Sequence, residues 1–309
     1  MTSGVGAEGS APQAPAADQG LEARIRGLVQ AVADTARLAR DAQHRVRVLE
    51  AQLLELRTML RPRETQEPPA NIGSRARSAG WGPRFAAIYD DFTDRFRGSA
   101  ADVRAKLEGY LPDVRRLVGA GGVVDLGSGR GEWLTLLRDA GVRARGVETN
   151  PAFVAAGRAR GLDIELGDAL GHLQEVPADS VDMITAFHVI EHLETEELLE
   201  LLEAARRVLR PGGCVLLETP NPTNLVMAAC DFYNDPTHRS PLPPALTEYL
   251  VSAQGFGDVE VRPLHPKPFP SATDAGADAS SDLRELVRQM FFGPQDYAVL
   301  GYRPPGTTG

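Results

Sequence analysis

The chain has 309 residues, 42% of them hydrophobic, which suffices for one substantial domain with an appendage. Its formal net charge of −9 gives no general electrostatic footprint for nucleic acid, so a nucleic-acid partner is not expected. Two cysteines make no disulfide framework, and we find no apolar run long enough for a membrane span or a secretory leader, so we expect a cytoplasmic protein.

The N-terminal part of the sequence is expected to lie outside the main domain. Residues 1–20 are mostly Gly, Ala, Ser and Pro and predict a disordered tail. Residues 21–61 carry apolar side chains at alternating steps of four and three. This heptad pattern favours a parallel two-stranded coiled coil and hence a homodimer, the alternative being a single amphipathic helix that lies on the main domain. Pro62 ends the repeat, and residues 62–84 predict a linker to a main domain over residues 85–309.

Predicted helices and apolar strands alternate along the main domain, after a helical stretch over residues 85–118. Strands are predicted over Gly122–Leu126, Ala144–Glu148, Ile164–Leu166, Val181–Phe187, Cys214–Glu218, Phe256–Val261 and Tyr297–Tyr302. Helices are predicted over Glu132–Ala140, Pro151–Arg160, Ala169–Gln174, Glu196–Leu209, Pro244–Gln254 and Asp282–Phe292. The segment Arg210–Gly213, with sequence Arg-Pro-Gly-Gly, predicts a helix stop and a tight turn. This order predicts an α/β fold with a doubly wound, mostly parallel sheet that ends in an antiparallel pair.

The strongest functional signal is the glycine-rich loop after the first strand. The strand ends near Asp125, and three closely spaced glycines open the next helix: Gly127, Gly129 and Gly131. Such a loop lets a nucleotide-like ligand approach the backbone, and Glu148 follows about 20 residues later, where a ribose-binding carboxylate is expected. A nicotinamide-dependent dehydrogenase would use similar parts, but the position of its last glycine is taken here by Glu132 or Leu134.

Five elements in this order resemble the class I S-adenosylmethionine-dependent methyltransferases: Val-Asp-Leu-Gly-Ser-Gly-Arg-Gly, Gly-Val-Glu, Gly-Asp-Ala, a fourth strand and Leu-Arg-Pro-Gly-Gly. The resemblance implies a Rossmann-like, seven-stranded sheet with S-adenosylmethionine across the strand ends. It implies that Asp125 and the three glycines cradle the methionine portion of the cofactor. Glu148 would accept both ribose hydroxyls, and Asp168 with the backbone of Ala169 would hold the adenine edge.

Each of these assignments has a plain structural alternative. Glu148 and Asp168 could be ordinary helix-cap or loop carboxylates, although their positions after successive strands favour the binding role. Arg95 or Arg97 could clamp the cofactor carboxylate or an acceptor anion through the planar guanidinium, or could lie in solvent on a helix face.

The segment after the fourth strand, Phe187-His-Val-Ile-Glu-His-Leu193, is expected beneath the transferable methyl group. His188 and His192 are candidate bases for an acceptor hydroxyl, while a packed structural histidine is the alternative for His192. The H-x-x-E-H spacing also occurs in some zinc peptidases, which the glycine-loop architecture disfavours. In the related ubiquinone-pathway O-methyltransferases this stretch binds a divalent ion, which makes Glu191 and His192 candidate ligands for Mg²⁺, with His188 standing where that family has Glu.

The segments Glu218–Asn224 and Asp231–Arg239 are dense in amide, hydroxyl, carboxylate and aromatic groups, which suits a sugar acceptor. They resemble bacterial glycan-modifying methyltransferases, especially the methyltransferase half of O-antigen chain-terminating enzymes. His238 is a third candidate base or acceptor-binding group, or else a loop histidine held by Asp235. The sequence therefore predicts a cytoplasmic S-adenosylmethionine-dependent O-methyltransferase that acts on a saccharide. The alternatives are methylation of a small non-sugar metabolite and a coiled-coil interaction protein whose domain only senses the cofactor.

Overall fold

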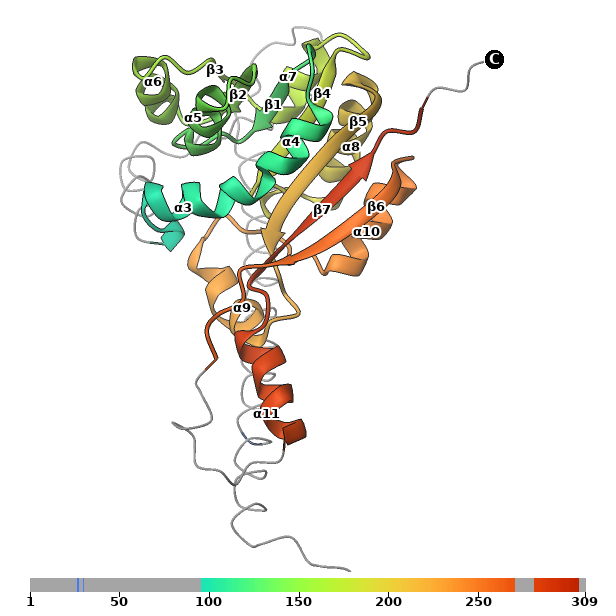
Figure 1. Ribbon diagram of the computed structural model, residues 1–309. Coiled ribbons are helices and arrows are strands. Elements are labelled where there is room, and N and C mark those ends of the chain that lie inside the picture. Colours follow the sequence, from blue (N-terminus) through green and yellow to red (C-terminus); the bar gives the residue numbers. More distant parts are fainter. Residues whose placement is uncertain (1–26, 28–29, 31–95, 270–280, 306–309) are drawn as a thin grey trace, which may run out of the picture.

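The computed structural model describes residues 96–269 and 281–305, together with Gly27 and Gln30 (Figure 1). Its seven-stranded sheet has the order β3-β2-β1-β4-β5-β7-β6. The strands are β1 (Val123–Leu126), β2 (Ala144–Glu148), β3 (Ile164–Leu166), β4 (Val181–Phe187), β5 (Leu209–Pro220), β6 (Gly257–Leu264) and β7 (Asp296–Tyr302). Strands β1 to β5 pair in parallel, and β7 runs antiparallel to both β5 and β6. The predicted Rossmann-like fold and its terminal antiparallel pair are confirmed.

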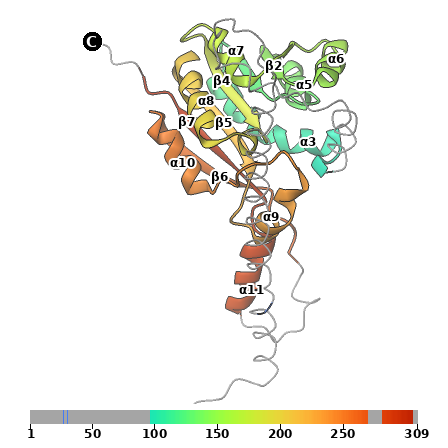
Figure 2. The ribbon, with the colours of Figure 1, turned by 180° about the vertical axis from the view of Figure 1, so that it is seen from behind.

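Helices cover both faces of the sheet (Figures 1 and 2). The longer helices are α3 (Ala100–Leu107), α4 (Leu111–Leu117), α5 (Glu132–Asp139), α6 (Pro151–Ala159), α7 (Ala169–Glu175), α8 (Thr195–Val208), α10 (Pro244–Ala253) and α11 (Ser281–Val287). Shorter ones are η1 (Glu108–Tyr110), η2 (Ile190–His192), α9 (Leu225–Ala229), η3 (Asp231–Asn234) and η4 (Arg288–Phe292). Among the helices of the described ranges, none combines the length and apolar character that a bilayer crossing requires.

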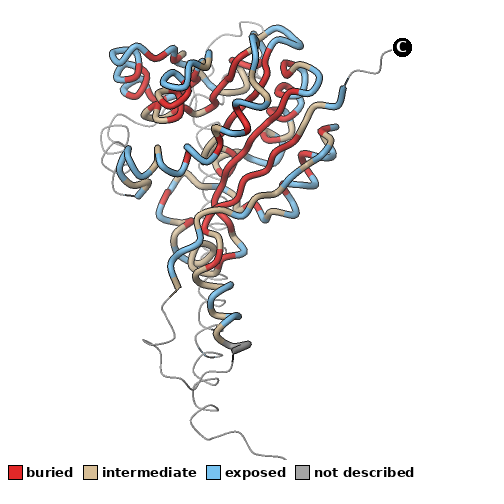
Figure 3. The backbone as a smooth tube through the Cα atoms, viewed as in Figure 1, coloured by how far each residue is buried: buried red, intermediate tan, exposed pale blue. Residues whose placement is uncertain are grey.

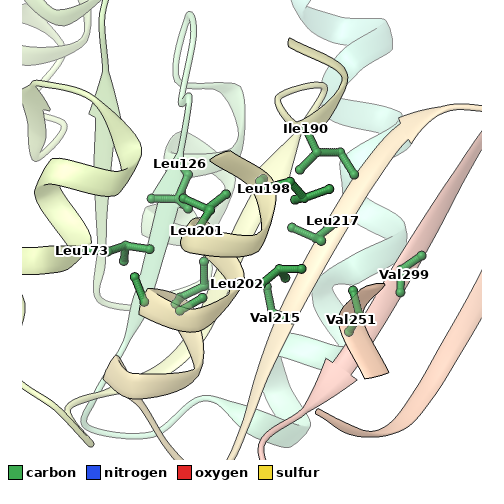
Figure 4. Close-up of a cluster of buried hydrophobic side chains, with 14 of the residues drawn as sticks. Leu126, Leu173, Ile190, Leu198, Leu201, Leu202, Val215, Leu217, Val251 and Val299 are labelled. Carbon is green, nitrogen blue, oxygen red and sulfur yellow. The ribbon is translucent and has the colours of Figure 1, made fainter. Parts of the chain in front are cut away.

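Two apolar clusters hold these layers together. On one face, α7, α8 and α10 pack on the sheet, and Figure 4 shows Leu198, Leu201 and Leu202 of α8 against Val215 and Leu217 of β5. On the other face, helices α3 to α5 pack on the same strands. The central strands β4, β5 and β7 are therefore buried along most of their length, whereas the edge strand β6 alternates (Figure 3). This burial on both sides explains why the central strands are almost continuously apolar in sequence.

The segment Arg210–Gly213 differs from the prediction. Helix α8 ends at Val208, as a stop signal requires, but β5 begins at once and includes these four residues. Val181 pairs with Leu209 and Met183 with Cys214, so Arg210–Gly213 form a bulge opposite a single residue of β4. Gly212 takes a φ of +78° within it, so the predicted tight turn lies inside the strand rather than before it.

Several predictions fall on other parts of the chain. The tail over residues 1–20, the linker over residues 62–84 and Arg95 lie outside the described residues. The coiled coil over residues 21–61 does so too, apart from Gly27 and Gln30, so the homodimer stays a prediction. The predicted helical stretch over residues 85–118 is described from Phe96, and there it is divided into α3, η1 and α4.

Candidate active site

The strand register brings the predicted site residues to one edge of the sheet. Leu126, the last residue of β1, pairs with Val147 of β2 on one side and with Ala186 of β4 on the other. The loop that begins at Gly127 therefore lies between Glu148 and His188. This carboxyl edge of the parallel strands is where doubly wound sheets bind their ligands.

Glycine is needed at the three positions of the loop for different physical reasons. All take positive φ, and a Cβ on Gly127 would lie 2.6 Å from Cγ2 of Val189, so packing alone requires that glycine. Gly131 is the N-cap of α5, and its added Cβ would lie 2.7 Å from Cδ1 of Leu162. A Cβ on Gly129 would meet nothing nearer than Nη1 of Arg97 at 3.9 Å. The backbone at Gly129 is thus the part of the loop left accessible to a ligand.

Glu148 is buried, and each of its carboxylate oxygens accepts a hydrogen bond from a backbone amide. Its Oε2 accepts a hydrogen bond of 2.7 Å from the amide of Gly129, and its Oε1 accepts one of 2.8 Å from Asn150. The carboxylate is 8% exposed. Oε1 also accepts a longer bond of 3.3 Å from the Thr149 hydroxyl, whereas Oε2 retains a further lone pair. Glu148 therefore holds the glycine loop in place and can still accept a hydrogen bond from a diol.

Asp125 lies beneath the loop in the sheet and is 2% exposed. Burial raises the pKa of its carboxyl to about 8, although the hydroxyl of Thr185, which donates to Oδ1 at 2.7 Å, opposes the shift and the charges of Glu148 and Glu132 add to it. Burial of an acid among other acids favours its neutral form. Asp125 is therefore a structural acid under the loop, and its side chain points to Thr185 of β4.

Asp168 is exposed and is the N-cap of α7, where its Oδ1 accepts a hydrogen bond of 2.8 Å from the amide of Gly171. Ala169 is the first residue of that helix. The helix-cap alternative for Asp168 is thus present. It does not conflict with the adenine-binding prediction, since a cap leaves the second carboxylate oxygen for other contacts.

Arg97 bridges two parts of the site. Its Nη2 donates a hydrogen bond of 3.2 Å to the carbonyl of His188, and its Nη1 is the atom closest to the open side of Gly129. The side chain is half-buried. The position between glycine loop and acceptor segment fits the predicted guanidinium clamp better than a solvated helix face.

His188 adopts the left-handed region with a φ of +56°, and its amide donates to the carbonyl of Glu218 at 2.8 Å. Its Nδ1 lies 3.2 Å from Glu191 Oε1, and its Nε2 lies 3.6 Å from Glu218 Oε1. Burial would lower the pKa of His188, but hydrogen bonds to these two carboxylates and the charge of Asp296 raise it to about 10. Both ring nitrogens thus face acids and neither offers a free lone pair.

His192 lies in the turn η2, and its ring packs at 4.8 Å between centroids on that of His238, which comes from a loop 46 residues later. Nδ1 of His192 lies 2.9 Å from the hydroxyl of Thr237, and that hydroxyl donates to Asp235 Oδ1 at 2.5 Å. A hydroxyl has one proton, so Thr237 accepts from Nδ1–H of His192. The lone pair of neutral His192 is therefore on Nε2.

A backbone carbonyl fixes the same tautomer in His238. Its Nδ1 lies 2.6 Å from the backbone oxygen of Phe232, which can only accept, so Nδ1 carries the proton. Burial is the main cause that lowers the pKa of His238, with Glu191 opposing and His192 contributing. Neutral His238 then has its lone pair on Nε2, 3.8 Å from Glu191 Oε1.

The loop that carries His238 is fastened to η2, the turn that follows β4. The amides of Arg239 and Ser240 donate to the carbonyl of Glu191 at 2.9 and 3.4 Å. The Glu191 side chain is fully buried and accepts from Thr219 at 2.9 Å through Oε2. The structure thus brings His238 to Glu191 and His192, which lie more than 40 residues earlier in the sequence.

Other polar residues of the predicted acceptor segments have structural partners. Asn221 donates to the carbonyl of Pro294 at 3.1 Å, and Asn224 donates to Gly293 at 3.2 Å while capping α9. These amides fasten α9 to the segment before β7. The contribution of this region to an acceptor site therefore falls mainly on Asp231–Arg239.

Sequence reasoning missed a buried network beside His188. The hydroxyl of Tyr110 donates to Glu218, and His265 Nδ1 lies 2.9 Å from Asp296 and 3.8 Å from Glu218. Tyr110 carried no signal because its partner is 108 residues away. Thr237 could have been anticipated, since an Asp two residues before a Thr is typical of an Asx turn, which Asp235 forms.

The fold and the glycine-loop site define the class of this protein. Residues 92–260 match the family model described as "Methyltransferase domain". Because this match spans more than half of the chain, the chain belongs to that family, and its domain is that of an S-adenosylmethionine-dependent methyltransferase. The dehydrogenase and peptidase alternatives are thereby set aside.

Individual relatives agree with this class. A probable S-adenosylmethionine-dependent methyltransferase of Mycolicibacterium smegmatis is 34% identical over 136 residues, which are 43% of this chain and 51% of the relative. The chain thus matches about half the length of that curated relative. A crystal structure of a SAM-dependent methyltransferase from Archaeoglobus fulgidus has a TM-score of 0.60 and 29% identity, covering 69% of this chain and 99% of that one. A Haloferax volcanii putative methyltransferase in complex with the activator Trm112 shares the fold, with a TM-score of 0.51, 23% identity and coverage of 72% and 96%.

Proposed function

We propose that this protein transfers a methyl group from S-adenosylmethionine to a hydroxyl of a saccharide. The observation that carries the proposal is the polar loop Asp231–Arg239, which is fastened to η2 and brings His238 onto His192. This pair of imidazoles next to the glycine-loop edge is suited to activate a hydroxyl that approaches the methyl donor.

The residues present fit the cofactor. Gly129 leaves backbone open where a Cβ would otherwise stand, and Glu148 offers carboxylate lone pairs beside it. Arg97, between this loop and His188, suits the carboxylate of the methionine portion, and Asp168 with Ala169 suits the adenine edge. When bound, S-adenosylmethionine supplies an electrophilic methyl group on a positive sulfonium. The chain must then position the acceptor and help it to lose a proton.

The histidines divide these tasks by their partners. His188 is held between Glu191 and Glu218, so we assign it a positioning role, although the sequence also made it a candidate base. His192 and His238 have their Nδ1 atoms occupied and their Nε2 lone pairs available. These two residues are the described groups best placed to activate an acceptor hydroxyl.

A saccharide is favoured over a small apolar metabolite by the side chains near these histidines. Asp231, Tyr233 and Arg239 are partly or fully exposed on the same loop, and such a mixture of carboxylate, aromatic and guanidinium groups recognises a polyhydroxyl ligand. Methylation of a small non-sugar metabolite is the competing proposal, and the two differ in the acceptor that supports turnover.

The test is methyl transfer from labelled S-adenosylmethionine to a panel of mono- and oligosaccharides and small phenols, amines and acids. We expect turnover on saccharides, with kcat lowered about 100-fold or more in His192→Gln, since proton removal by a positioned group contributes about 10²–10⁴-fold. His44→Gln, a histidine outside the described residues, is the matched control and should keep its rate. Turnover confined to the non-sugar acceptors would refute the saccharide assignment.

A further inference from the structure

The groups Glu191, His192 and His238 form a cluster that the methyl-transfer chemistry alone does not require. Each offers one ligand atom, and these atoms lie within 4.8 Å of one another. Glu191 is fully buried, the His238 side chain is 10% exposed, and His192 is half-buried. Two imidazoles and one carboxylate converging from η2 and from the Asp231–Arg239 loop make a three-donor set.

The donor atoms of this cluster still have lone pairs available for a ligand. Oε1 of Glu191 faces two imidazole nitrogens, His188 Nδ1 at 3.2 Å and His238 Nε2 at 3.8 Å, and its Oε2 accepts from the Thr219 hydroxyl at 2.9 Å. Each carboxylate oxygen therefore uses one lone pair and retains another for a further ligand.

Hydrogen bonds from their Nδ1 atoms fix both imidazoles in the tautomer with an unprotonated Nε2, which metal coordination requires. The backbone oxygen of Phe232 accepts from Nδ1–H of His238, and the Thr237 hydroxyl, ordered by Asp235, accepts from Nδ1–H of His192. Histidine ligands of metal sites usually donate their second ring nitrogen in this way to a carbonyl or to a group held by a carboxylate. Both Nε2 lone pairs are then available for coordination.

A second cluster of histidine and acidic side chains differs from this one in its hydrogen bonding. His188, Glu218 and Asp296 also lie close together. Their atoms are already used by one another, however, because Tyr110 donates to Glu218 and His265 pairs with Asp296. That cluster is satisfied internally, whereas no hydrogen bond among the described residues uses the Nε2 atoms of His192 and His238.

We propose that Glu191, His192 and His238 bind one divalent transition-metal ion of the Zn²⁺ type. Two imidazole nitrogens and one carboxylate suit Zn²⁺ and its neighbours in the first row, while Mg²⁺ prefers oxygen ligands alone. This assignment adds His238 to the ligands expected from the sequence and replaces the expected Mg²⁺ with a softer ion. Its consequence for catalysis rests on the proposed function: the Nε2 atoms of His192 and His238 would hold the ion instead of taking the proton, and the coordinated acceptor hydroxyl, with its pKa lowered, would lose its proton to solvent.

The experiment measures metal binding on the full chain, without acceptor or turnover, so that its outcome is independent of the saccharide assignment. Apo protein prepared with a chelator is titrated with Zn²⁺ and with Mg²⁺ by calorimetry, and bound metal is counted after dialysis. We expect one Zn²⁺ per chain and an affinity for Mg²⁺ at least about 100-fold weaker. Absence of stoichiometric Zn²⁺ binding would overturn the proposal.

Variants locate the site. His192→Ala and His238→Ala should each weaken Zn²⁺ binding by about 100-fold or more, Thr237→Val by about 10-fold through the lost outer partner, and His44→Gln not at all. Zn²⁺ affinity that is unchanged in both ligand variants would overturn the assignment. Binding of S-adenosylhomocysteine checks the fold of each variant. Should a ligand variant not fold, the visible absorption of bound Co²⁺ in Thr237→Val decides: an altered spectrum supports the site and an unchanged one refutes it.

Discussion

Glu148 is predicted to stabilise the glycine loop in addition to binding the cofactor, and the two roles can be separated by substitution. In Glu148→Ala the buried amide of Asn150 loses its acceptor at 2.8 Å, and the half-buried amide of Gly129 loses its acceptor at 2.7 Å. An unsatisfied buried donor costs about 1–3 kcal/mol, and the amide of Gly129, which water can reach, costs up to about 1 kcal/mol. The free energy of unfolding should therefore fall by about 1–4 kcal/mol.

Glu148→Gln refines this prediction because the amide keeps one oxygen acceptor of the two. We expect a smaller loss of about 1–2 kcal/mol. The assay is urea unfolding followed by tryptophan fluorescence, since Trp133 lies buried on α5 directly after the loop. Equal slopes with urea would show that the change is one of stability and not of the extent of unfolding.

The same variants test the ligand role. Removing the carboxylate should weaken S-adenosylhomocysteine binding by about 10–100-fold, because hydrogen bonds to a charged acceptor contribute about 1.5–3 kcal/mol. Glu175→Ala, which removes an exposed carboxylate at the end of α7, is the matched control and should change neither quantity. Stability within about 0.5 kcal/mol of wild type in Glu148→Ala would refute the reasoning from the two amide contacts.

Three further predictions concern the domain that supports the site. Burial would raise the pKa of Asp113, but Arg262 and Arg116 lower it. The carboxylate therefore stabilises the fold above its unfolded pKa of about 4, and this contribution disappears as the pH falls through the lower folded value. Arg262→Gln should lower the free energy of unfolding in urea by about 1–3 kcal/mol at pH 7, and a difference from wild type that does not shrink at acidic pH would contradict this. Tyr110→Phe leaves buried Glu218 without its phenol donor and should cost about 1.5–3 kcal/mol, while a neutral effect would show that the network does not depend on it. Leu202→Ala, in the α8 cluster at 1% exposure, should lower the unfolding free energy by about 2–5 kcal/mol, against less than about 0.5 kcal/mol for exposed Leu246→Ala on α10.

Local sequence signals were sufficient for most of the fold. The apolar strands and the glycine loop are contiguous segments whose pattern reflects burial on both faces, and their predicted bounds differ from the observed ones by few residues. Arg210–Gly213 was harder, because Pro and Gly indicate a change of direction in a turn and in a strand bulge alike. The pairing of Val181 with Leu209 decides between them, and that contact is not local.

The candidate site was predictable in its residues but less so in its arrangement. The order of motifs placed Gly129, Glu148 and His192 at one edge of the sheet. No local pattern could show that His188 adopts a positive φ and that its ring lies between two carboxylates. Nor could it show that the ring of His192 packs on that of His238. These outcomes depend on a loop that docks on the carbonyl of Glu191 from a distant part of the chain.

The most direct test of the central claim identifies the atom that receives the methyl group. The full chain is incubated with S-adenosylmethionine labelled with ¹³C in the methyl group and with a saccharide acceptor, and the product is examined by ¹³C and heteronuclear correlation spectroscopy. The account predicts one new methyl signal, correlated to a sugar ring carbon through an ether oxygen and dependent on His192. A methyl group on nitrogen, sulfur or a carboxylate, or on no saccharide at all while other acceptors are methylated, would contradict it.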